Sequence, residues 1–139
     1  MMITRTAAVS ASILFAVLAA FQLALAAGAP WGGAAYGGLT EHPGVELRVS
    51  SVVATLVWAA AALVVLKRAG FGTWAPLPRR ALPVAVWVLA GLTAVAIVPN
   101  AISPSGLERS IWVPWAVVTT LLVLTVAVTS RKRDNTQTR

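Results

Sequence analysis

The charged residues of this 139-residue chain are missing from four long segments, and this absence constrains its fold more than any other feature. The uncharged segments cover residues 6–40, 49–66, 81–107 and 110–130. A helix that crosses a bilayer needs about 20 predominantly apolar residues, and each segment is long enough to supply them. Charged residues make up 11% of the chain, against about a quarter in soluble domains. The sequence therefore predicts an all-α protein, a four-helix transmembrane bundle.

The expected helices cover approximately residues 6–27, 48–66, 81–99 and 110–130, and they form a single transmembrane domain. The remaining loops are too short to hold a separate soluble domain. The longest loop, residues 28–47, contains the pairs Gly32-Gly33 and Gly37-Gly38, which disfavour a strand or a long helix. The polar tail, residues 131–139, is expected to be disordered and cytoplasmic.

The positive charges predict the orientation of the bundle. With the N-terminus inside, nine of the 11 Lys and Arg residues lie on the inner side, and only Arg48 and Arg109 lie outside. This split predicts an N-in, C-in orientation, with both termini in the cytoplasm. An alternative is that Ala24–Ala26 is the cleavage site of a signal peptide, but the apolar run before it is closer to a full span than to a secretory core.

The two halves of the chain share a charge pattern. Glu46-Leu47-Arg48 precedes the second expected helix, and Leu107-Glu108-Arg109 precedes the fourth. The pattern is compatible with two similar helical hairpins derived from one duplicated unit. Any four-helix chain with this orientation would also repeat its charges in this way.

Composition excludes several classes of function. The chain has no cysteine, which rules out disulfides, thiol redox relays and iron–sulfur clusters, and its single histidine, His42, lies in a loop. We therefore expect no metal, haem or other cofactor. The first span lacks the acidic residue that proton-coupled small multidrug exporters require. The net charge of +7 is concentrated at helix ends, a pattern typical of membrane topology and not of nucleic-acid binding.

Polar and aromatic residues near the predicted outer surface form the candidate ligand-binding set. Gln22 and Asn100 lie at matching depth and are expected to pair, because an amide in lipid needs a partner. Trp58 falls in mid-span, where it either packs in the bundle or forms a wall of a pocket. The full set is Gln22, Trp31, Glu46, Arg48, Trp58, Asn100, Ser103, Glu108 and Arg109.

Two interpretations of the charged members of this set remain open. In the structural one, Glu46 pairs with Arg48, and Glu108 pairs with Arg109, across helix ends. In the functional one, an arginine holds an anionic group and a glutamate orients it in an outer-facing pocket. No residue of the set is assigned a catalytic role.

Small residues recur every fourth position along the first expected helix, which would let another helix approach closely. This small-residue strip consists of Ser12, Ala16, Ala20, Ala24 and Gly28. It is a candidate contact with a second copy of the chain or with another membrane protein. The other expected partners are membrane lipids, and no nucleic acid is expected.

Three stretches carry a resemblance to known sequences: residues 26–38 (AAGAPWGGAAYGG), residues 100–109 (NAISPSGLER) and Trp112-Val113-Pro114. Together with the Ala/Val/Arg-rich composition, they resemble a group of small uncharacterised bacterial four-helix membrane proteins of actinobacterial type. The resemblance implies a fold and a membrane location, and it carries no activity or catalytic residue.

The leading functional hypothesis is a non-enzymatic membrane protein, either an accessory subunit or a lipid-binding protein. A second hypothesis is a small oligomeric transporter whose pathway lies near Gln22, Asn100 and Trp58. A third is a membrane enzyme that modifies a lipid at the outer interface.

Overall fold

The computed structural model describes the backbone of residues 1–137 and the side chains through Arg131. In this part of the chain there are four long helices and no strands. All four are long and apolar enough to cross a membrane, which confirms the predicted all-α fold of a multi-pass membrane protein. The long helices are α1 (Met2–Ala26), α2 (Val45–Arg68), α3 (Leu82–Ala101) and α4 (Gly106–Gln137), and three short 3₁₀ turns are η1 (Gly32–Ala34), η2 (Tyr36–Gly38) and η3 (Arg79–Ala81).

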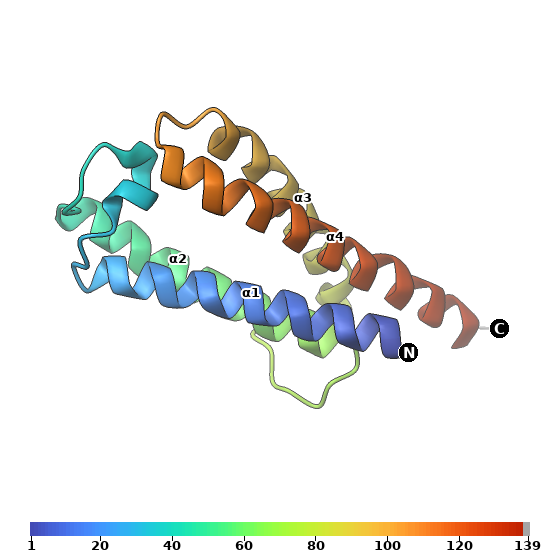
Figure 1. Ribbon diagram of the computed structural model, residues 1–139. Coiled ribbons are helices and arrows are strands. Elements are labelled where there is room, and N and C mark those ends of the chain that lie inside the picture. Colours follow the sequence, from blue (N-terminus) through green and yellow to red (C-terminus); the bar gives the residue numbers. More distant parts are fainter. Residues whose placement is uncertain (138–139) are drawn as a thin grey trace.

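The helices pack as two antiparallel pairs, α1 with α2 and α3 with α4 (Figure 1). The pairs converge at the end that holds both termini and the loop of residues 69–78, here called the terminal end (Figure 1). They diverge at the opposite end, the first-loop end, where residues 27–44 and 102–105 connect the helices. This arrangement agrees with two hairpins. The environments of the two glutamates in the repeated charge pattern differ, since Glu46 is exposed and Glu108 is buried.

Side-chain size explains why the two ends differ. At the terminal end the helices meet through small buried residues, among them Ala8, Ala11, Ala61, Ala90 and Ala127. Such residues let helix backbones approach closely, which is the main source of packing energy between helices in lipid. Toward the first-loop end the facing residues are tryptophan and phenylalanine, which hold the two pairs apart.

Hydrogen bonds connect the helices within the apolar bundle. Thr4 and Thr129 join α1 to α4 at 2.8 Å, and Thr93 and Thr120 join α3 to α4 at 2.9 Å. The indole N–H of Trp115 donates to the carbonyl oxygen of Leu14 at 3.3 Å. Each such bond is worth roughly 0.6 kcal/mol inside a membrane, so the bonds orient the helices more than they stabilise them.

The helix ends differ from the predicted boundaries, most of all in α4. This helix was predicted to begin at Ser110, but it begins at Gly106 because the hydroxyl oxygen of Ser105 accepts a hydrogen bond from the backbone N–H of Glu108 at 3.2 Å. That contact is a helix N-cap, and the spacing of serine and glutamate is the one found in capping boxes. Helix α3 continues past Pro99 to Ala101, and the Asn100 amide donates to the carbonyl of Ala96 in the same last turn.

The prediction of a disordered tail was wrong over residues 131–137. Helix α4 continues through this segment to Gln137, while residues 138–139 lie outside the described part of the chain. Arg131, Lys132 and Arg133 are favourable helix residues. No glycine or proline interrupts the segment.

Candidate functional site

The first loop is a folded unit, here called the first-loop lid (residues 27–44). Its two ends meet where the backbone N–H of Gly32 donates to the carbonyl oxygen of Glu41 at 3.2 Å. The phenol of Tyr36, which has a left-handed backbone (φ 55°), donates to the carbonyl oxygen of Leu47 at 3.1 Å. It also contacts the hydroxyl of Ser51 on α2. These contacts tie the lid to the α1–α2 pair.

A second set of hydrogen bonds ties the lid to α4 and to the loop before it. The indole N–H of Trp112 donates to the carbonyl oxygen of Ala34 at 2.6 Å, and the hydroxyl of Ser105 donates to that of Gly33 at 2.6 Å. Because the lid contacts both helical pairs, it closes the divergent end of the bundle (Figure 1).

Glu108 is the centre of this second set. Its side chain is only 7% exposed. One carboxylate oxygen accepts the backbone N–H of Gly37 at 2.9 Å, and the other accepts the hydroxyl of Ser103. One buried carboxylate therefore joins the lid, the third loop and the first turn of α4.

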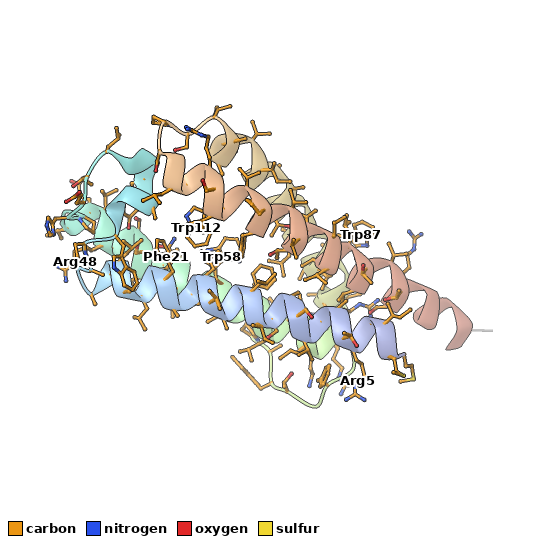
Figure 2. All side chains as sticks on the ribbon, in the orientation of Figure 1. Arg5, Phe21, Arg48, Trp58, Trp87 and Trp112 are labelled. Atoms are coloured by element: carbon orange, nitrogen blue, oxygen red, sulfur yellow. The ribbon has the colours of Figure 1, made fainter. Side chains whose placement is uncertain are left out.

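Beneath the lid lies a cavity of about 190 Å³ between the two helical pairs. Figure 2 shows Phe21, Trp58 and Trp112 in the space that separates the pairs. The walls come from all four helices and from the lid: Leu18, Phe21, Gln22, Ala34, Ala35, Trp58, Ala96, Asn100, Glu108, Trp112 and Trp115.

The aromatic walls belong to a larger aromatic cluster in which each ring contacts the next. Trp112 meets Phe21 edge to face at 4.9 Å between ring centroids, and Trp58 meets Trp115 in the same way at 6.0 Å. Such pairs contribute roughly 0.5–1.5 kcal/mol each beyond the area they bury. The cluster runs from the half-exposed lid residue Trp31 through Phe21, Trp112, Trp115 and Trp58 to the buried Phe15.

Polar groups with remaining hydrogen-bonding capacity also line the cavity. The amide oxygen of Gln22 accepts from the Ser51 hydroxyl at 2.7 Å, which leaves the side-chain NH₂ of Gln22 as a donor. Among the described residues, neither this NH₂ nor the indole N–H of Trp58 has a hydrogen-bond acceptor. The cavity thus combines aromatic walls with donors suited to a carbonyl or hydroxyl oxygen.

The predicted pair between Gln22 and Asn100 is wrong, although both residues line the cavity. Each amide bonds to a nearer group: Gln22 accepts from Ser51, and Asn100 donates to the carbonyl of Ala96 at 2.7 Å. A local partner one helical turn away is available to Asn100 without bridging the space between the helical pairs.

The predicted pairs Glu46–Arg48 and Glu108–Arg109 are also absent among the described side chains, because backbone groups at helix ends and in the lid take their place. The guanidinium of Arg48 donates to the carbonyl oxygen of Ala26 at 2.8 Å, at the C-terminus of α1. That of Arg109 donates to the carbonyl of Ser103, and Glu46 is exposed. Carbonyls at a helix end lack intrahelical donors and favour cations.

The structure brings together four of the nine predicted site residues around one cavity: Gln22, Trp58, Asn100 and Glu108. Ser103 adjoins them through its bond to Glu108, and Trp31 stacks on Phe21 at 6.0 Å. Three charged residues do not line the cavity: Glu46, Arg48 and Arg109.

The candidate set predicted from the sequence lacks the aromatic wall that α4 contributes through Trp112 and Trp115. A helical signal was present: Glu108, Trp112 and Trp115 are spaced by four and three residues and so share one face of a helix. Phe21 and Ser51 gave no comparable signal, because helices that are apolar all round do not show which face is buried.

The small-residue strip of α1 is only partly covered. Ala16 and Ala20 are exposed, while Ser12, Ala24 and Gly28 are half-buried. Its proposed contact with a partner stays a prediction.

The serine and histidine side chains at this end of the bundle lie in different environments. Ser103 is bonded to Glu108, while the only histidine, His42, is exposed in the lid. Within the described residues, no three His, Asp or Glu side chains group closely enough to hold a metal ion.

No protein-family model, no curated protein and no solved structure matches the chain. The resemblance to actinobacterial-type membrane proteins therefore stays a prediction.

Proposed function

We propose that this chain is a non-enzymatic, multi-pass protein of the bacterial inner membrane that binds a membrane lipid in the aromatic cavity under the first-loop lid. The observation that carries the proposal is the composition of the cavity wall: four aromatic side chains, two amides and a buried carboxylate contributed by all four helices. Aromatic surface with a few convergent polar groups is the usual make-up of sites for small organic ligands.

The size of the cavity indicates which part of a lipid it would hold. Its volume of about 190 Å³ is below the roughly 300–1,000 Å³ of sites that enclose a whole drug-sized ligand. It suits a ring or a polar headgroup, with the remaining chains lying in the bilayer. An oxygen of that group would accept a hydrogen bond from the NH₂ of Gln22.

Filling the cavity tests this proposal. Ala96 lines the cavity from α3, so the substitution Ala96→Phe places a ring in the space that the ligand would occupy. We expect copurified lipid, measured by native mass spectrometry after gentle extraction, to fall about tenfold, which corresponds to roughly 1.4 kcal/mol. The smaller substitution Ala96→Leu should give a partial loss, and it provides a result even if the phenylalanine prevents folding.

The neighbouring residue supplies the matched control. Val95 is 70% exposed on the outer face of α3, so Val95→Phe adds a ring to the same helix without entering the cavity. Lipid retention should then stay at the level of the unmodified protein. Equal retention by the Val95 and Ala96 variants would exclude the cavity as the lipid site.

Transport is the second candidate, because the three residues expected along a transport pathway, Gln22, Trp58 and Asn100, do line the cavity. Against it, the helices at the terminal end are closely packed around buried residues such as Ala8, Val65 and Val126. Lipid binding is therefore the better-supported function. Flux of a labelled ligand across proteoliposomes that depends on Gln22 would favour transport instead.

A further inference from the structure

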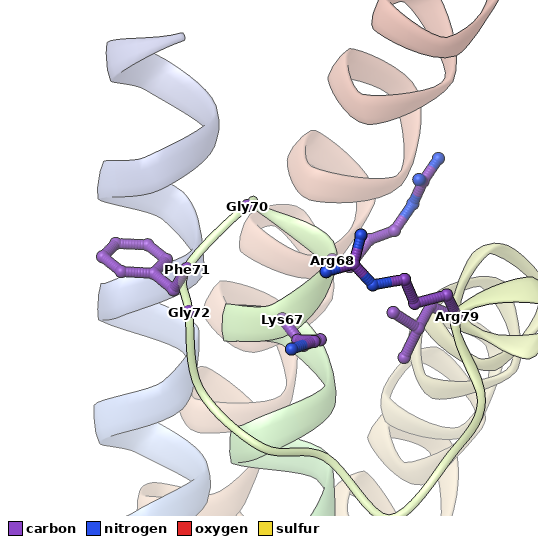
Figure 3. Close-up of a pocket in the computed structure, with 7 residues that line it drawn as sticks. Lys67, Arg68, Gly70, Phe71, Gly72 and Arg79 are labelled. Atoms are coloured by element: carbon purple, nitrogen blue, oxygen red, sulfur yellow. The ribbon is translucent and has the colours of Figure 1, made fainter.

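A second cavity, of about 320 Å³, lies at the terminal end, between the C-terminus of α2 and the start of α3. Figure 3 shows the side chain of Arg79 reaching from η3 toward Arg68 at the end of α2, with Lys67 beside it. The lining residues are Lys67, Arg68, Gly70, Phe71, Gly72, Arg79 and Leu82. This basic pocket is separate from the aromatic cavity, with which it shares no residue.

Among the described residues that line it, the pocket gathers positive charge and holds no carboxylate. Three of its seven lining residues are cations, and none is acidic. A fourth cation adjoins it, since the guanidinium of Arg5 lies 4.3 Å from the centre of the Phe71 ring.

Two of the cations are available to a ligand. Neither Lys67 nor Arg79 has a hydrogen bond or an ion pair to another described residue. Arg79 is exposed and Lys67 is half-buried, so both can reach an anion that enters from the surface. Helix α3, whose first residue lines the pocket, also has no side-chain cap at its N-terminus, and an anion there would interact well with the helix dipole.

We propose that the basic pocket binds a phosphate group, with Lys67 and Arg79 as its direct ligands. An arginine and a lysine that line the same pocket are the usual recognition groups for phosphate. The pocket lies at the end of apolar spans, and Trp74, two residues after its lining residue Gly72, is exposed and of a type that marks the membrane interface. This position makes the phosphodiester of an anionic lipid headgroup the expected source, and free phosphate the alternative source.

Two adjacent arginines allow a matched test. Arg79 lines the pocket and Arg80 does not, yet both are exposed residues of η3. The full-length protein is placed in nanodiscs that contain phosphatidylglycerol and phosphatidylcholine in equal amounts, and the bound lipid is counted by native mass spectrometry. We expect Arg79→Gln to lower phosphatidylglycerol retention about fivefold relative to Arg80→Gln, since a charged hydrogen bond is lost only in the first.

The general attraction of cations to an anionic membrane is the competing explanation, and it would affect both variants alike. Equal losses in Arg79→Gln and Arg80→Gln, or no loss in either, would overturn the proposal. Lys67→Gln gives a second measurement, and it should reproduce the Arg79 result. Because neither residue lines the aromatic cavity, the outcome is independent of the function proposed above.

Competition with inorganic phosphate distinguishes a lipid headgroup from free phosphate as the ligand of the basic pocket. Retention of phosphatidylglycerol that millimolar phosphate does not reduce supports a lipid headgroup as the ligand. If phosphate displaces phosphatidylglycerol from the unmodified protein, and this displacement is lost in Arg79→Gln, the pocket is a site for free phosphate.

Discussion

Replacing Glu108 with alanine is expected to release the first-loop lid and to lower the free energy of unfolding by about 3 kcal/mol. The substitution removes the acceptor of the half-buried Gly37 N–H and of the buried Ser103 hydroxyl. An unsatisfied buried donor costs roughly 1–3 kcal/mol, so two such donors account for the expected loss. Denaturant unfolding in detergent micelles measures the loss, and hydrogen exchange at the Gly37 amide reports on the lid.

Glu46 provides a control with the same change of charge. Its side chain is exposed at the start of α2 and forms no hydrogen bond among the described residues, so Glu46→Ala should change stability by less than about 0.5 kcal/mol. Glu108→Gln should fall between the two, because the amide oxygen can still accept from Gly37 while the charge is lost. If the alanine variants of Glu46 and Glu108 unfold alike and exchange alike, Glu108 does not hold the lid in place.

The four spans were predictable from the sequence because a bilayer imposes a length and a composition that are visible without knowledge of any contact. The uncharged segments gave the number and the order of the helices. Their ends were less predictable, since local capping decides them. Helix α4 begins at Gly106 because Ser105 caps it, a signal of two residues that the hydropathy pattern does not contain.

The candidate site was predictable only in part. Gln22, Asn100 and Glu108 were identified because polar groups near a membrane stand out against an apolar background. Their partners were predicted from charge and depth, and those predictions were wrong. Backbone groups of the lid and of helix ends compete for the same side chains, as when Arg48 bonds to Ala26, and their positions depend on how a glycine-rich loop folds.

Replacing Gly32 with alanine is expected to open the lid at its base. A Cβ atom at Gly32 would lie 1.9 Å from the carbonyl oxygen of Thr40, well inside any allowed contact. The obstacle is backbone and not a flexible side chain, so the lid must shift, and the bond from the Gly32 N–H to Glu41 is strained or lost. Overpacking of this kind costs about 1–3 kcal/mol, which denaturant unfolding would measure.

Gly44 is the matched control for this substitution. It ends the same lid, its φ of −67° is allowed to any residue, and a Cβ there has no neighbour within 4 Å. Gly44→Ala should therefore leave amide exchange in the lid unchanged, and because it replaces the N-cap glycine of α2 it should lower stability by less than about 1 kcal/mol. Equal exchange in the two variants would contradict the close approach of Gly32 to Thr40.

The Gly32 variant also connects the lid to the proposed binding of lipid. Gly32 does not line the aromatic cavity, but Ala34 and Ala35, two and three residues later, do. A shift at the base of the lid moves this part of the wall and exposes the cavity to water. Lipid retention should therefore fall in Gly32→Ala and persist in Gly44→Ala. Hydrogen exchange could show that the lid opens in Gly32→Ala while lipid retention is unchanged. In that case the cavity binds its ligand without the lid, and the aromatic walls of the helices are sufficient for binding.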